Sequence, residues 1–116
     1  MKKGAFIGML FHTRDYIHLA HLDAVLYNTH VILDDFYKNI TELIDELVEA
    51  TQADEGILTI HIPATSLSAD SLEFLLEFKS FLNGSRDIFN KSFQQSIIDE
   101  IEILTNKTVY KLKYLK

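Results

Sequence analysis

Two pairs of potential metal ligands lie in one stretch of the chain that contains no glycine or proline. His30 and Asp34 form the first pair, and Asp45 and Glu49 form the second. Residues four apart project from the same face of a helix, with their Cβ atoms about 6 Å apart. An imidazole and carboxylates held in this way suit a divalent metal of the iron or zinc type, because such metals accept both kinds of ligand. The stretch is therefore a candidate metal site.

The two pairs are too far apart on one helix to hold the same ion. Asp34 and Asp45 are eleven residues apart, which corresponds to roughly 16 Å along the helix axis at about 1.5 Å per residue. If the same helix of a second subunit ran antiparallel alongside, His30 and Asp34 of one chain would meet Asp45 and Glu49 of the other. The spacing therefore predicts a metal site shared between subunits of a homo-oligomer that is at least a twofold dimer.

The spacing also resembles the ferroxidase centre of the mini-ferritins, the DNA-binding proteins from starved cells. The order His-x11-His-x3-Asp-x10-Asp-x3-Glu is met without a gap at His18, His30, Asp34, Asp45 and Glu49. The resemblance implies that both histidines and the first aspartate come from one subunit, and that the second aspartate and the glutamate come from its dimer mate. It implies iron as the metal, with zinc as an alternative, and leaves open whether the site only binds ferrous iron or also oxidises it.

The segment between the two histidines departs from the mini-ferritin pattern. That family usually has Trp directly after the first histidine and a glycine in the turn before the second, whereas this chain reads His18-Leu-Ala-His21 and has no glycine before His30. His21 is the equivalent of the first ligand if the turn is three residues shorter, so His18 and His21 are both candidates. The chain is also similar to the small mini-ferritin-like proteins of tailed bacteriophages, in the segments Phe11-His12, His21-Leu22 and Tyr110–Lys116.

Four amphipathic helices are expected to position these residues. Apolar residues recur at three-four spacing, and the chain has only four glycines and one proline. The pattern predicts helices at about residues 5–22, 27–52, 68–83 and 86–113. Ser68 or Ser71 is expected to cap the third helix, Gly84 to end it, and Ser85 to cap the fourth. One domain over residues 1–116 with an all-α, ferritin-like four-helix bundle is therefore predicted.

Residues 54–67 form the one clear non-helical connection, and they join the second helix to the third. Their length allows a ferritin-type long crossover, because fourteen extended residues can span roughly 45 Å. A simple up-and-down return is also compatible with this length. The expected core residues of the first two helices are Ile7, Leu10, Phe11, Ile17, His18, His21 and Leu22, and then Leu33, Phe36, Tyr37, Ile40, Leu43, Ile44, Leu47 and Val48.

Composition limits the classes of function. The 116 residues carry a net charge of −6, which argues against a general nucleic-acid surface, and DNA binding is not expected although Lys107, Lys111, Lys113 and Lys116 lie close together. Cysteine is absent, which excludes disulfides and thiolate metal sites. The apolar N-terminal stretch is too short for a secretion signal or a membrane span, so a cytoplasmic protein is expected.

A second class of function stays open. A small ferritin-like bundle, phage-encoded, would act without catalysis as a protein-interaction module that binds a host protein. Fold does not determine function, so the predicted bundle is compatible with this reading as well.

Overall fold

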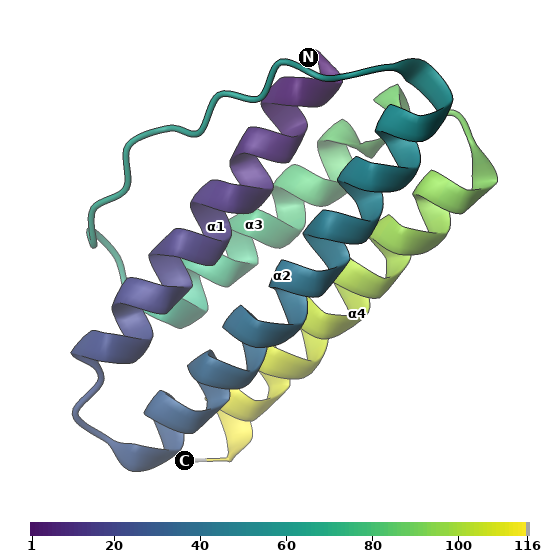
Figure 1. The fold of residues 1–116 in the computed structure, drawn as a ribbon. Helices are drawn as coiled ribbons and strands as arrows, with labels where there is room; N and C mark the ends of the chain where they lie inside the picture. Colours follow the sequence, from purple (N-terminus) through teal and green to yellow (C-terminus); the bar gives the residue numbers. More distant parts are fainter. Residues whose placement is uncertain (116) are drawn as a thin grey trace.

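Four α-helices make up most of the computed structural model, which describes residues 1–115. They are α1 (Lys3–Asp23), α2 (Tyr27–Glu55), α3 (Ser71–Ser85) and α4 (Ser92–Tyr114), and a 3₁₀ turn, η1 (Arg86–Ile88), follows α3. The prediction of an all-α four-helix bundle is confirmed (Figure 1). Among the described residues, no helix is long and apolar enough to cross a membrane.

The helices form a ring in which α1 packs against α2, α2 against α4, α4 against α3, and α3 against α1. Helices α1 and α4 run away from the end of the bundle where the N-terminus lies, and α2 and α3 run toward it (Figure 1). Every neighbouring pair in the ring is therefore antiparallel, while the consecutive helices α2 and α3 point in the same direction. This arrangement requires one long connection, as in ferritin-like bundles.

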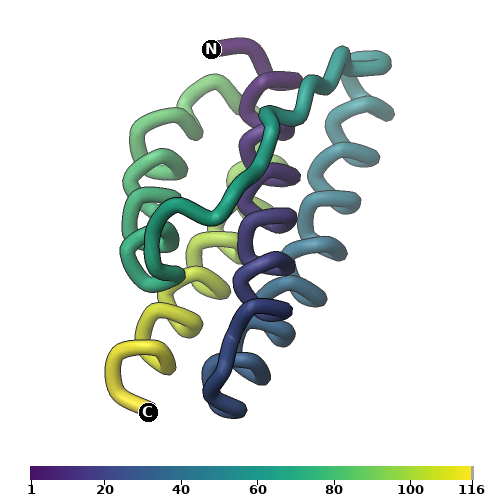
Figure 2. Tube along the Cα trace, turned by 90° about the vertical axis from the view of Figure 1, so that its left-hand side faces the viewer, coloured from purple at the N-terminus to yellow at the C-terminus, as the bar shows by residue number. Residues whose placement is uncertain are grey.

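Residues 56–70 make that connection by running along the outside of α1, as Figure 2 shows. Two glycines allow the close approach. A Cβ atom on Gly4 would lie 1.9 Å from the carbonyl oxygen of Thr59, and one on Gly8 would lie 2.0 Å from the carbonyl oxygen of His61. The crossover backbone can therefore lie directly against α1 only because α1 has no side chains at these positions.

Polar contacts hold the second half of the crossover. The Nδ1 atom of His12 lies 2.9 Å from the hydroxyl oxygen of Thr65. The Tyr16 hydroxyl donates to the carbonyl oxygen of Ala69 and accepts a hydrogen bond of 3.1 Å from its N–H. The Tyr16 ring also stacks on Phe74 of α3, with the ring centroids 3.6 Å apart. Of the two connections that the sequence left open, the structure has the long crossover.

The predicted cap of the third helix was wrong. Neither Ser68 nor Ser71 caps α3, because Asp70 occupies the N-cap position and its carboxylate accepts a hydrogen bond of 2.9 Å from the N–H of Glu73. An aspartate at this position also places a negative charge at the positive end of the helix dipole.

The predicted junction between the third and fourth helices was also wrong. Helix α3 continues through Gly84, and Ser85 is its last residue rather than the cap of the next helix, which begins at Ser92. A glycine ends a helix efficiently when it takes a positive φ. Within residues 1–115 only Gly56 does so, at the end of α2, with a φ of 95°.

Side-chain contacts explain why the chain leaves the helix after α3. Phe89 is 2% exposed, and its ring packs edge-on against Phe6 of α1 with the centroids 4.9 Å apart. The side-chain amide of Gln95 donates to the carbonyl oxygens of Arg86 and Phe89, at 2.9 and 2.7 Å. Burial of the Phe89 ring and these replacement hydrogen bonds favour a bent connection over one continuous helix.

The core of the bundle is apolar and receives residues from every helix. Of the core residues predicted for α2, Leu33, Phe36, Ile40, Ile44 and Leu47 are fully buried, whereas Leu22, which was predicted for the core of α1, is 64% exposed. The buried hydrophobic residues of the bundle are Phe6, Ile7, Leu10, Tyr16, Ile17, Leu33, Phe36, Ile40, Ile44, Leu47, Leu75, Phe78, Leu82, Phe89, Ile97, Ile98, Ile101 and Val109.

Candidate metal centre

Two of the candidate histidines face each other across the turn between α1 and α2. His21 lies in the last turn of α1 and His30 in the first turn of α2, and their imidazole rings stack with centroids 3.8 Å apart. The Nδ1 atom of His21 lies 2.8 Å from the carbonyl oxygen of His30, and the Nδ1 atom of His30 lies 2.9 Å from the carbonyl oxygen of His21. The two hydrogen bonds tie the helix ends together.

This reciprocal pairing determines which ring nitrogen carries the proton. A carbonyl oxygen only accepts hydrogen bonds, so the Nδ1 atoms of His21 and His30 must be the donors. The Nε2 atom of each neutral ring then keeps its lone pair. Histidines that bind metals are commonly oriented in this way, with the second ring nitrogen donating to a carbonyl oxygen.

Asp34 lies one turn beyond His30 and completes a group of three candidate ligands. Its Oδ1 atom is 3.7 Å from the Nε2 atom of His21, and its Oδ2 atom is 2.7 Å from the ammonium nitrogen of Lys38. The pKa of Asp34 is lowered from its ordinary value, first because Lys38 donates a hydrogen bond to it. Partial desolvation opposes this shift, and the charge of Lys38 adds to it, as do those of His21 and His30 when these rings are protonated. The same hydrogen bond raises the pKa of Lys38.

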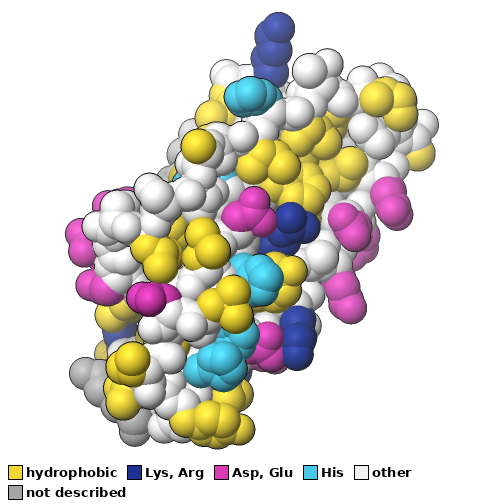
Figure 3. Space-filling view, turned by 60° about the vertical axis from the view of Figure 1, so that its left-hand side comes forward, with side chains coloured by type: hydrophobic (Ala, Val, Ile, Leu, Met, Phe, Trp, Pro, Cys, Tyr) yellow, Lys and Arg dark blue, Asp and Glu magenta, His cyan; other side chains and the backbone are white. Residues whose placement is uncertain are grey.

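His18, the other candidate for the first ligand, lies beside this group rather than in it. Its ring stacks on Tyr37 of α2 with the centroids 4.1 Å apart, and it is 6.2 Å from the ring of His21. Figure 3 shows a face of the bundle on which histidine side chains reach the surface next to acidic and basic side chains. The structure thus brings together His21, His30 and Asp34, with His18 as their neighbour.

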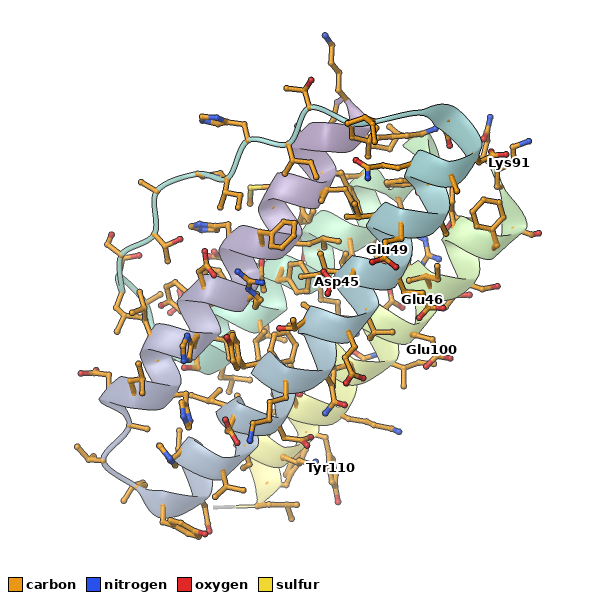
Figure 4. The ribbon with its side chains drawn as sticks, viewed as in Figure 1. Asp45, Glu46, Glu49, Lys91, Glu100 and Tyr110 are labelled. Atoms are coloured by element: carbon orange, nitrogen blue, oxygen red, sulfur yellow. The ribbon has the colours of Figure 1, made fainter. Side chains whose placement is uncertain are left out.

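Asp45 and Glu49 (Figure 4) lie one turn apart in the C-terminal half of α2, whereas His30 lies in its first turn. Both side chains are exposed. Within residues 1–115 no three His, Cys, Asp or Glu side chains are arranged to hold a metal ion, and this includes His21, His30 and Asp34. The histidine group and the Asp45–Glu49 pair are therefore separate on one chain, which agrees with the distance worked out from their spacing.

Lys38, the partner of Asp34, was not among the residues predicted from the sequence. The signal was present, because an Asp followed four residues later by a Lys is the spacing of an ion pair on a helix. The stacking of His18 on Tyr37 was not predicted either, and the sequence carries no local signal for it. Contacts of that kind depend on how α1 and α2 pack.

The fold and this group of residues define a four-helix bundle with one long crossover and a cluster of two histidines and an aspartate at one end of α1 and α2. The chain belongs to the DUF5856 family, a family of unknown function, whose model matches residues 21–112. The matched region begins at His21 and includes His30, Asp34, Asp45 and Glu49, whereas His18 precedes it. Comparison with the curated proteins and with the solved structures finds no match.

Proposed function

We propose that this protein binds ferrous iron at two equivalent sites in a twofold dimer, in the manner of a mini-ferritin. The observation that carries the proposal is the reciprocal hydrogen bonding of His21 and His30, which leaves both Nε2 atoms free to bind a metal beside the ionised Asp34. One chain supplies these three ligands. Asp45 and Glu49 of the partner subunit supply the remaining two.

The exposed position of the second pair supports the shared arrangement. Asp45 and Glu49 make no ion pair within residues 1–115, so their carboxylates are available to a neighbouring subunit. A twofold axis that brings one pair onto the other passes between the two α2 helices, level with Ile40, which is midway between the pairs along the helix. The α1–α2 face of the bundle is then the face that meets its copy.

The donor set suits iron. Imidazole nitrogens and carboxylate oxygens together bind ferrous iron, and carboxylate oxygens also stabilise the ferric state. The same ligands therefore support oxidation of the bound ion as well as its binding. The choice of His21 over His18 as the first imidazole follows from the contact of His21 with His30 and Asp34, since the ring of His18 stacks on Tyr37 instead.

An anaerobic titration with ferrous iron tests the proposal, with size-exclusion chromatography and light scattering on the same samples. We expect one tightly bound ion per chain and a dimer or larger assembly. His30→Ala and Asp34→Ala should each weaken binding by about 100-fold or more, because loss of a ligand costs more than loss of a residue that only orients one.

Asp35→Ala and Glu42→Ala are the matched controls, since both remove an exposed carboxylate from α2 outside the ligand group. They should leave the affinity nearly unchanged. Equal affinities in all four variants, or a strict monomer in the presence of bound metal, would refute the shared site.

A second candidate function is a protein-interaction module, and the surface around the turn at residues 24–26 favours it. Leu22, Val25, Leu26 and Tyr27 are 64–95% exposed there. Two open cavities of about 410 and 440 Å³ adjoin this turn. Elemental analysis of protein purified without a metal-affinity tag separates the two functions. Stoichiometric iron or zinc supports the metal site, and metal-free protein with an intact helical fold supports the interaction module.

A further inference from the structure

The carboxylate of Asp34 already has a cationic partner, and that partner comes from the same helix. The ammonium nitrogen of Lys38 lies 2.7 Å from the Oδ2 atom of Asp34, while the Oδ1 atom faces the Nε2 atom of His21 at 3.7 Å. One oxygen of the carboxylate therefore points to the histidine pair, and the other is held by the lysine.

The ammonium group of Lys38 can move away from Asp34 into solvent. The Lys38 side chain is 70% exposed, whereas that of Asp34 is 31% exposed. A lysine ammonium on a flexible four-carbon stem is strongly hydrated, and it can move into water without unpacking any other group. An incoming divalent ion offers the carboxylate a larger charge than the ammonium does, and the two cations repel each other at this distance.

We propose that Lys38 is a built-in competitor for the metal ion. In the metal-free protein it neutralises Asp34, and the ion must displace it in order to bind both carboxylate oxygens. This inference rests on the proposed metal function and adds a residue that sets the affinity of the site. An ion of single charge gains little from displacing an ammonium, so Lys38 also favours multiply charged ions over sodium or potassium.

A second lysine provides a matched comparison on the same bundle. The ammonium nitrogen of Lys111 on α4 lies 3.8 Å from a carboxylate oxygen of Asp35, the residue next to Asp34. Asp35 has no histidine contact among the described residues and lies outside the proposed ligand group. Removal of the charge of Lys111 therefore changes the net charge as much as removal of the charge of Lys38, but leaves Asp34 paired.

Calorimetric titration of the full chain with Zn²⁺ alone, a redox-inert probe, tests the inference. Lys38→Gln should tighten binding by about three- to tenfold, because it removes both an exposed ion pair and a repelling charge. Lys38→Arg keeps the charge and the ion pair and should bind no more tightly than the wild-type protein. Lys111→Gln should stay within about twofold of wild type, since only the distant charge changes.

The outcomes separate this inference from the function on which it rests. Unchanged or weaker binding in Lys38→Gln, with a wild-type protein that binds Zn²⁺, overturns the role of Lys38 alone. Equal tightening in Lys38→Gln and Lys111→Gln also overturns it, since net charge would then explain the effect. Absence of Zn²⁺ binding in the wild-type protein and in every variant overturns the proposed function together with the role of Lys38.

Discussion

Complementation between two inactive variants tests whether one metal site takes ligands from two chains. One variant carries His30→Ala and Asp34→Ala, and the other carries Asp45→Ala and Glu49→Ala. Each homodimer lacks two of the five proposed ligands at both of its sites and should not bind ferrous iron tightly. A mixed dimer has one site in which all ligands are intact. Its other site lacks all four of the substituted residues.

The expected recovery follows from the geometry. The two pairs are roughly 16 Å apart along α2, so neither variant can rebuild a site from its own chain. Random reassociation of equal amounts makes half of the dimers mixed, and each mixed dimer has one complete site out of two. About a quarter of the wild-type iron capacity should therefore return on mixing.

The assay is an anaerobic ferrous iron titration after the two variants are unfolded together and refolded, with native mass spectrometry to count the mixed dimers. A control mixture pairs the His30→Ala, Asp34→Ala chain with a chain that carries Asp34→Ala alone, and it should recover nothing because both defects lie on the same side of the site. Failure to recover binding when mixed dimers are present would refute the shared site. Full binding in either variant by itself would refute it as well.

Three further predictions concern the crossover, the ion pair and nucleic acid. Gly8→Ala should lower the free energy of unfolding, measured by urea denaturation, by about 1–3 kcal/mol, because the new Cβ would overlap a carbonyl of the crossover. Gly84 lies in open space inside α3, so Gly84→Ala should raise the free energy of unfolding by up to about 1 kcal/mol. Lys38→Gln should raise the pKa of Asp34 in a carboxyl NMR titration, because the hydrogen bond from Lys38 is the main cause of its lowered pKa. The stability that this ion pair adds is present at neutral pH. It is lost as the pH falls through the lowered pKa of Asp34 and as the pH rises through the raised pKa of Lys38. Duplex DNA should not bind appreciably at about 150 mM salt in an anisotropy titration, and submicromolar affinity under those conditions would show that assembly gathers lysines of the 107–116 segment into a basic patch.

The positions of the helices could be predicted from the sequence because apolar periodicity is a local property. In α2 the residues Leu33, Phe36, Ile40, Ile44 and Leu47 recur at three-four spacing, and all five are buried. The helix ends were less predictable. Asp70 caps α3 through a local hydrogen bond to Glu73, a signal that the sequence does carry. Gly84 lies within α3 because the chain bends only after it, where Phe89 packs against Phe6 of α1.

The direction of α3 was decided only by tertiary structure. The connection between α2 and α3 is long enough for either topology, so its length did not predict whether α3 runs parallel or antiparallel to α2. Gly4 and Gly8 let the crossover backbone lie against α1, and Tyr16 binds its far end. The contacts join residues more than fifty positions apart, and no periodic pattern in the chain reports such pairs.

The geometry of the candidate site was also predictable from the sequence only in part. The sequence by itself determined that His30 and Asp34 share a face of α2, and that Asp45 and Glu49 are too distant to join them, since spacing on one helix sets both the angle and the separation. Only the tertiary structure placed His21 against His30, because that contact depends on the short turn at residues 24–26 and on the packing of α1 against α2. Local geometry follows from the order of residues along one helix, whereas contacts between helices depend on the packing of the whole bundle.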